Sequence, residues 1–262
     1  MKHFPVLALV AAFGCEAISS AAGNEEAKAL ANDAALSVDS ALKESALLLA
    51  MTDGSEPDTT PETAAATAAS KATTVFTPTS CVTATASGAT VTYTLDGCEG
   101  PFGLTGLSGP MVATFTTAPN GLAVNLASSG VNLTGGKLVL NTSGVYSKSG
   151  AEQTMAISTQ TVGVGASEEP ITRSGNYAVT WTDTCVTLSG TWANVTLDSA
   201  FSSTVANYEV CDGKCPKSGA NITAAYTQGG SAGAITLQFT GSNQVSYTGT
   251  SGIGVVTLDC TR

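Results

Sequence analysis

Residues 90–95 read Thr-Val-Thr-Tyr-Thr-Leu, and this strict alternation of polar and apolar side chains decides the fold class. Because successive side chains of a β-strand point to opposite faces, Val91, Tyr93 and Leu95 would share one face and the threonines the other. The pattern recurs further along the chain, in the runs 122–126, 177–181, 222–226 and 235–239. From residue 75 onward the sequence therefore predicts half-apolar strands rather than helices.

Short turn signals separate these runs, and they favour antiparallel pairing of neighbouring strands. Examples are Ser87-Gly88, Pro119-Asn120-Gly121, Ser149-Gly150 and Gly241-Ser242-Asn243. We therefore expect residues 73–262 to form a mainly β domain, an antiparallel β-meander that follows one N-terminal helix. With one apolar face per strand, the meander would fold into a sandwich or an open barrel, or would lay that face against the helix.

The N-terminal helix is expected within the segment 16–54. Its apolar stripe recurs at spacings of three, four or seven, which is the period of a helix face. The stripe comprises Ala27, Leu30, Ala34, Val38, Ala41 and Leu48. Because alanine dominates it, we expect the helix to lie close against another surface; a partly frayed stalk is the alternative.

Residues 55–72 have the composition of a flexible linker, since they contain prolines, acids, threonine and alanine. Six of the seven cysteines lie beyond this segment, so the β domain is expected to fold and remain soluble without residues 1–72. The competing expectation is that the helix covers an apolar sheet face. Its removal would then expose a patch large enough to cause aggregation.

The body of the chain holds six cysteines: Cys81, Cys98, Cys185, Cys211, Cys215 and Cys260. An even number in an exported chain indicates disulfides. We predict Cys81–Cys98, because these residues flank a hairpin that needs only a bulge to bring them opposite each other. Cys185 is expected to bond Cys211 or Cys215, and the remaining one of that pair to bond Cys260. A metal site at Cys211 and Cys215 is the rival interpretation, but further ligands at close spacing are missing and no metal is expected.

The groups that most often carry catalysis are scarce in this sequence. The single histidine is His3, near the N-terminus, so the commonest general base is missing from the body. The remaining acids include Glu168, Glu169, Asp183, Asp198 and Asp259. They lie near turns or strand ends and are expected to be solvated. We therefore expect no catalytic residues, no cofactor and no enzymatic activity.

The net charge of −10 and the pI near 4.4 disfavour nucleic acid as a partner, because polyanions reward clustered Lys and Arg. Repeated Thr-x-Thr steps such as 90–94 and 180–182 could form a flat hydroxyl surface of the kind seen in ice-binding or sugar-binding proteins. Threonine also simply favours the solvent face of a sheet, which is the plainer interpretation.

The N-terminus has the pattern of an export signal. Lys2 precedes an uncharged run over residues 4–13, and Ala12-Phe13-Gly14-Cys15 ends it. A cysteine at this point resembles the lipobox of bacterial lipoproteins, which implies that residues 1–15 are a signal with Cys15 as the lipidated residue. The alternative is an ordinary secretory signal cut near Ser20-Ala21-Ala22.

In layout the chain resembles uncharacterised bacterial cell-envelope lipoproteins: a lipobox, a helix, an Ala/Thr-rich linker and a disulfide-bonded β domain. The resemblance implies a membrane partner through a lipid anchor and a place at the cell envelope, expected at the outer membrane. It implies a non-enzymatic role, structural or adhesive, in which a glycan or lipid ligand remains open. The alternative is a carrier that holds an apolar ligand inside a curled sheet, and the least favoured is a hydrolase using carboxylates alone.

Overall fold

The structure, a computed structural model, describes residues 25–101, 104–133, 136–165, 168–182, 185–211, 214–228 and 230–257. The predicted signal with Cys15 lies outside these residues, as do Asp183, Asp259 and Cys260. The helical elements are α1 (Glu25–Thr52), α2 (Pro61–Val75) and a short 3-10 turn η2 (Thr79–Cys81). The strands are β1 (Val82–Ser87), β2 (Thr90–Gly100), β3 (Leu104–Ala118), β4 (Gly121–Ser128), β5 (Val131–Leu133), β6 (Gly136–Val139), β7 (Asn141–Ser149), β8 (Glu152–Val164), β9 (Pro170–Trp181), β10 (Cys185–Val195), β11 (Ser199–Cys211), β12 (Asn221–Gln228), β13 (Ser231–Phe239), β14 (Gln244–Gly249) and β15 (Gly252–Thr257).

All strands belong to one antiparallel 15-stranded sheet, so the predicted β-meander is confirmed. Its main path follows chain order, β1-β2-β3-β4-β7-β8-β9-β10-β11-β12-β13-β14-β15. The alternating runs behave as predicted: Val91, Tyr93 and Leu95 are buried, whereas Thr92 and Thr94 are exposed. The strands form a single sheet, and its end strands β1 and β15 do not pair, so the meander is not closed into a barrel. Its apolar face is covered mainly by a helix.

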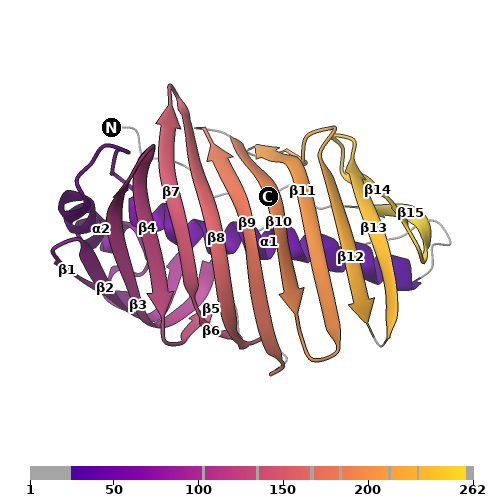
Figure 1. Ribbon diagram of the computed structural model, residues 1–262, viewed down its shortest axis with the longest axis horizontal. Coiled ribbons are helices and arrows are strands. Elements are labelled where there is room, and N and C mark those ends of the chain that lie inside the picture. Colours follow the sequence, from indigo (N-terminus) through magenta and orange to yellow (C-terminus); the bar gives the residue numbers. More distant parts are fainter. Residues whose placement is uncertain are drawn as a thin grey trace.

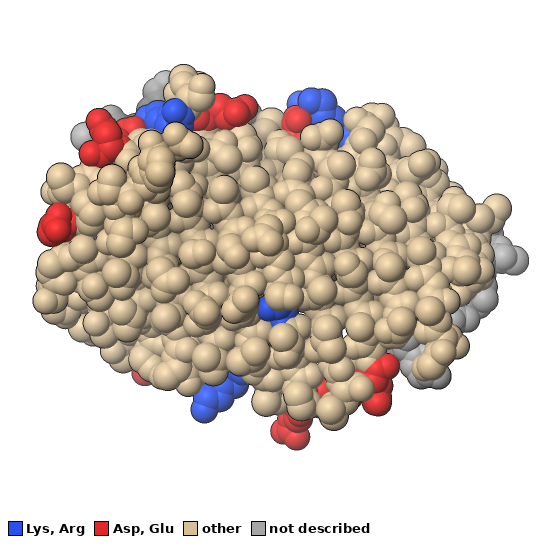
Figure 2. All heavy atoms as spheres, viewed as in Figure 1, with Lys and Arg blue, Asp and Glu red and all other residues tan. Residues whose placement is uncertain are grey.

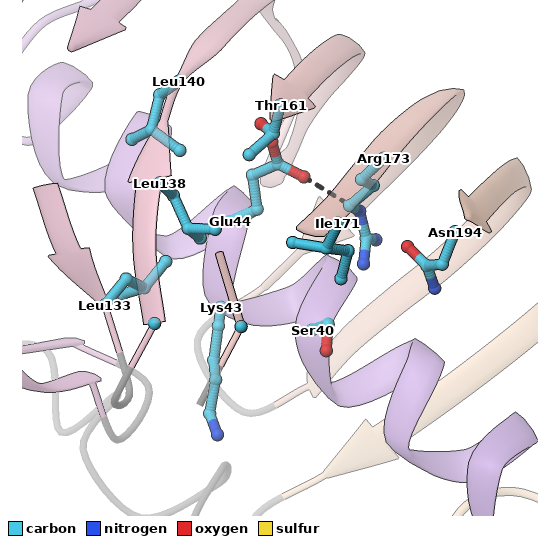
Figure 3. A pocket seen from close by; sticks show the side chains of 12 residues that line it. Ser40, Lys43, Glu44, Leu133, Leu138, Leu140, Thr161, Ile171, Arg173 and Asn194 are labelled. Carbon is cyan, nitrogen blue, oxygen red and sulfur yellow. Dashed lines mark hydrogen bonds and ion pairs between the residues drawn. The ribbon is translucent and has the colours of Figure 1, made fainter. Parts of the chain in front are cut away.

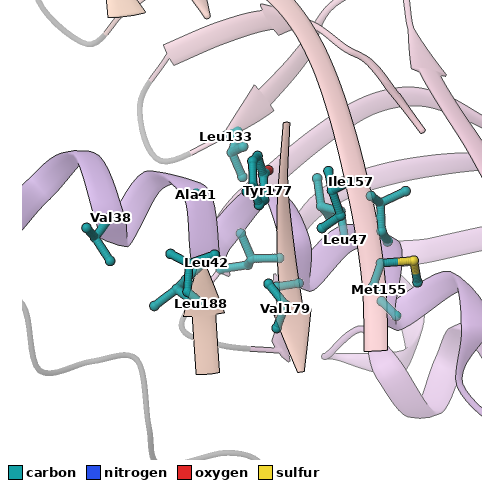
Figure 4. Close-up of a cluster of buried hydrophobic side chains, with 14 of the residues drawn as sticks. Val38, Ala41, Leu42, Leu47, Leu133, Met155, Ile157, Tyr177, Val179 and Leu188 are labelled. Atoms are coloured by element: carbon teal, nitrogen blue, oxygen red, sulfur yellow. The ribbon is translucent and has the colours of Figure 1, made fainter. Parts of the chain in front are cut away.

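That helix is α1, which crosses behind the strands from β2 to β15 (Figure 1). Every residue of the predicted stripe is buried, from Ala27 to Leu48. Figure 4 shows Leu42 of α1 beside Leu188 of β10. One continuous core therefore contains both α1 and the inner face of the sheet. This is the arrangement of the competing expectation, and it argues against a β domain that carries its own core.

The β5–β6 hairpin leaves the main path and adds a second layer over part of α1. β5 pairs with β3, and β6 pairs with β8, so the hairpin forms a second route between those two strands. In Figure 1 it lies behind the main sheet, on the side of α1. Leu133 of the hairpin joins the core beside α1 (Figure 4). The hairpin thus lies near the middle of α1, where Leu133 and Leu138 line one cavity together with Ser40 and Glu44.

The segment predicted as a flexible linker, 55–72, instead contains most of α2, which is a correction. Thr60 caps this helix, because its side chain accepts a hydrogen bond from the backbone N–H of Thr63, and Pro61 occupies the first turn. Ala64, Ala65, Ala68 and Ala72 are buried. The helix contacts β1, β2 and β3. Small side chains let α2 approach the sheet closely, so a composition typical of linkers forms a packed helix here.

Two disulfides close hairpins of the sheet. Cys81 bonds Cys98, as predicted. The register of β1 with β2 is regular, and a bulge lies instead in the pairing of β2 with β3, where the register shifts between Leu95 and Cys98. Cys185 bonds Cys211, which decides between the two partners left open. These two residues face each other in the register of β10 and β11. Cys215 is also disulfide-bonded, and Cys260, its expected partner, lies outside the described residues.

Candidate functional site

A buried ion pair lies at the centre of the interface between α1 and the sheet. Glu44 projects from α1, and its Oε2 atom is 3.1 Å from Nε of Arg173 on β9. Both side chains are nearly inaccessible, at 6% and 8% exposed. A carboxylate buried this deeply needs hydrogen bonds as well as a counter-charge, because the desolvation of each ion is costly.

Hydroxyl groups from three strands supply those hydrogen bonds. Thr142 of β7 donates to Glu44 Oε1 at 2.7 Å, Thr161 of β8 donates to the same oxygen at 2.9 Å, and Thr159 donates to it as well. Tyr177 of β9 donates to Oε2 at 3.1 Å. Burial, followed by the charge of Glu44, holds the pKa of the Tyr177 phenol well above its usual range, so this group remains a donor. The carboxylate is therefore fully used within the protein.

A second polar cluster surrounds Ser37, which lies about two helical turns from Glu44 towards the N-terminus of α1. Trp192 donates its indole N–H to Ser37 Oγ, and Asn194 donates from Nδ2 to the same oxygen at 3.2 Å. The hydroxyl of Ser37 lies 3.1 Å from that of Ser203 on β11. The Trp192 ring also lies 5.5 Å from the Arg173 guanidinium carbon, which joins the two clusters.

Arg173 and Asn194, which carry unsatisfied polar atoms, line a cavity. Among the described residues, the buried side-chain atoms without a hydrogen-bond partner are Arg173 Nε and Nη2, Asn194 Oδ1 and Ser55 Oγ, of which Arg173 Nε lies in the ion pair with Glu44. The side chains of Arg173 and Asn194 line a cavity of about 320 Å³ between α1, the β5–β6 hairpin and β9. Figure 3 shows the Arg173 guanidinium and the Asn194 amide side by side at one end, with Leu133 and Leu138 at the other. A second cavity of about 290 Å³ shares Ser40 and Asn194 with the first.

The opposite face of the sheet, turned away from α1 and called here the outer face, carries a different feature. The cross-strand register places one uncharged polar residue of each main-path strand from β1 to β14 in a single row. This outer-face row consists of Ser87, Thr90, Thr114, Asn125, Ser143, Ser158, Asn176, Thr191, Thr204, Thr223, Thr236 and Thr248. Only Thr90, Thr114 and Thr236 of the row are half-buried, and the others are exposed.

Charged side chains are sparse on this broad face. Figure 2 shows the face almost entirely free of acidic and basic groups, which gather along its upper and lower margins. Lys148 and Glu56 form one such marginal pair, with 2.8 Å between Nζ and Oε2, and Lys217 and Glu209 form another at 3.0 Å. The outer face therefore offers hydroxyl and amide groups in an electrically neutral surround.

The carboxylates considered from the sequence do not meet in a site. Glu168 and Glu169 are exposed between β8 and β9, and Asp198 is exposed between β10 and β11. The one cluster of potential metal ligands in the described part of the chain is Cys185, Glu209 and Cys211. Its two sulfurs are bonded to each other, so neither is the thiolate that a metal would require.

Glu44 and Arg173 escaped the sequence analysis, although each carries a readable signal. Glu44 falls between Ala41 and Leu48 at helical spacing, so it interrupts the apolar stripe with a charge. Arg173 precedes Tyr177 and Val179 by even numbers of residues and shares their buried face. A charge on an apolar face predicts a buried partner; what the sequence could not show was which two charges would meet.

No protein-family model, curated protein or solved structure matches this chain. Within the described residues, none of the helices has the length and apolar character needed to cross a membrane. The outer face and the cavity are therefore the features from which a function is inferred.

Proposed function

We propose that this is a non-enzymatic exported protein, anchored at the bacterial cell envelope through Cys15, that adheres to neutral polysaccharide with its outer face. The observation that carries the proposal is the unbroken row of Ser, Thr and Asn across the sheet. Hydroxyls and amides both donate and accept hydrogen bonds, as sugar hydroxyls do. The neutral surround disfavours strongly charged polymers, whose capture rewards charged groups of opposite sign.

The spacing of the row suits a repeating ligand. Adjacent strands lie about 4.8 Å apart, so the row presents one hydrogen-bonding side chain at each such step. A single exposed hydrogen bond contributes little, but many bonds to one polymer act together because each holds the next group at high effective concentration. The expected binding is therefore weak for single sugars and stronger for long or insoluble chains.

Retention on insoluble neutral polysaccharides such as cellulose and starch tests the adhesive function. Wild-type protein should be retained. The double variant S158E/T191E should lose most of that retention, because it places in the row two charges that binding would have to desolvate. Ala66 is exposed on α2, so A66E is the control for added negative charge and should be retained like wild type. Absence of retention on every neutral polysaccharide, or equal retention of S158E/T191E, would refute the proposal.

The anchor is tested separately by membrane partitioning in a bacterial host. Wild-type protein should fractionate with membranes, and C15S should appear in the soluble fraction, because the thiol is the group that receives the lipid in the resembled lipoproteins. Equal partitioning of the two forms would argue against lipidation of Cys15 while leaving the polysaccharide test intact.

The alternative function, a carrier with an apolar ligand inside a curled sheet, has less support. The apolar face of the sheet is occupied by α1, whose residues Ala34, Ala41 and Leu47 are completely buried. A large apolar ligand on that face would have to displace the helix and break the contacts of Glu44.

A further inference from the structure

The cavity beside Arg173 has a polar end that the protein itself does not satisfy. Arg173 is 7% exposed, and Glu44 engages its Nε atom, yet Nη2 has no partner among the described residues. A buried guanidinium donor without an acceptor costs the desolvation of that group. The hydroxyls of Thr142, Thr159 and Thr161 donate to Glu44, and none of them accepts a hydrogen bond from Nη2.

The charge of the lining favours an anion. Arg173 is the buried positive group of the lining, and the oxygens of Glu44 are already hydrogen-bonded within the protein. A carboxylate that accepts from Nη2 would form a charge-assisted hydrogen bond, which is about twice as strong as a neutral one.

Asn194 adds a second requirement, because its buried Oδ1 lacks a donor. Its Nδ2 is directed to Ser37, so the amide oxygen is the atom left for a ligand. A hydroxyl carried close to the ligand's carboxylate could donate to it, while the carboxylate itself could not.

The other end of the cavity is apolar and of limited size. Leu133, Leu138 and Leu140 from the β5–β6 region form this wall, and Ile171 of β9 lies beside Arg173 (Figure 3). Ligand pockets range from about 300 to about 1,000 Å³, so a cavity of about 320 Å³ accommodates a small molecule rather than a whole lipid.

From these observations we propose that the cavity is a binding site for a small amphipathic hydroxy acid, with its carboxylate at Arg173, its hydroxyl at Asn194 and its apolar tail along the leucine wall. This site lies on the α1 side of the sheet and is independent of the outer face. Its failure would leave the polysaccharide proposal untouched, and the reverse also holds.

Thermal shift and tryptophan fluorescence test the proposal, since Trp192 packs on Arg173. With β-hydroxydecanoate as the probe, the full-length protein should show saturable quenching and a rise in melting temperature through mass action. Decanoate should bind more weakly, and decanol and decylamine more weakly still. Equal effects of decanol or decylamine, or no saturable binding of β-hydroxydecanoate, would overturn the assignment.

Two variants locate the binding. E44Q/R173Q removes both charges together, so that no buried ion is left alone, and should weaken β-hydroxydecanoate binding about tenfold or more. Ser40 is exposed on α1 and lines the cavity, so S40F should block it without changing the ion pair. The matched control A29F, at an exposed position of the same helix, should bind like wild type. Undiminished binding by S40F would place the ligand elsewhere and contradict the proposal.

Discussion

At the scale of single residues, Glu44 determines how α1 sits on the sheet. A buried ion pair is weak evidence for net stability, because desolvation offsets much of the attraction. Its value here is geometric: hydroxyls of β7 and β8 and the guanidinium of β9 converge on one carboxylate. A shift of α1 by one turn would strand all of these groups in the core, so the cluster selects one register of helix against sheet.

The first prediction concerns the loss of one charge from this pair. Glu44→Gln leaves the Arg173 charge buried without its counter-ion and should lower the free energy of unfolding by about 3–5 kcal/mol. The double variant E44Q/R173Q should be destabilised less than the single one, because no lone ion remains. Urea unfolding of both measures the difference, with E152Q at an exposed strand position as the reference. A lower free energy of unfolding for E44Q/R173Q than for E44Q would contradict this account.

The second prediction uses the alkaline titration of Tyr177. Its pKa is raised in the folded protein from 10.0, first by burial and then by Glu44, so its contribution is fully present below pH 10 and is lost as the pH rises above that value. Tyr177→Phe should lose about 1–2 kcal/mol at neutral pH through the missing hydrogen bond. It should also show a shallower fall of stability above pH 10.

Urea unfolding at several alkaline pH values measures that slope. Tyr146 also titrates at alkaline pH in both proteins, since burial and the charge of Glu56 raise its pKa to about 12. The slope should therefore be reduced in Y177F rather than abolished. Parallel curves for wild type and Y177F would show that Tyr177 does not titrate with unfolding.

At the scale of elements, the sequence pattern predicted the strands and α1, whose formation depends on the periodicity of neighbouring residues. Alternation identified the strands, and the stripe identified α1, because each pattern repeats over many residues. The helix α2 was missed because its Thr/Ala composition matches a linker, although Thr60, Pro61 and Glu62 form a helix start signal. The contact of Glu44 with Arg173 joins residues far apart in sequence, and only the register of the assembled sheet brings them together.

The third prediction tests why α1 is rich in alanine. Ala41 is completely buried where the helix lies against the sheet (Figure 4), so Ala41→Leu should lower stability by about 1–3 kcal/mol through overpacking. Ala29→Leu makes the same change at an exposed position of α1 and should have an effect of about 0.5 kcal/mol or less. Thermal or urea unfolding of the pair is the measurement. Equal stability of the two variants would mean that the helix has room at Ala41.

At the scale of the whole molecule, the two faces of the sheet have opposite chemistry. The inner face is apolar and is completed only by α1, whereas the outer face is neutral and polar in every strand of the row. A sheet of this width with an uncovered apolar face would present a patch far larger than soluble monomers expose. The helix is therefore part of the folding unit, and the disulfides of the strands do not replace it.

The last prediction follows from this shared core. Residues 73–262, expressed in an oxidising compartment, should be aggregated or molten, because the fragment lacks α1 and most of α2 and exposes the inner face around Val179, Leu188 and Leu237. The control, residues 23–262, retains α1 and should be monomeric with a cooperative thermal transition. Co-expression of residues 23–72 as a separate chain should restore solubility to the 73–262 fragment, since the same apolar contacts can form between two chains. Size-exclusion chromatography and thermal unfolding distinguish these outcomes. A monomeric, cooperatively folded 73–262 fragment would show instead that the sheet holds its own core and that α1 is an accessory cover.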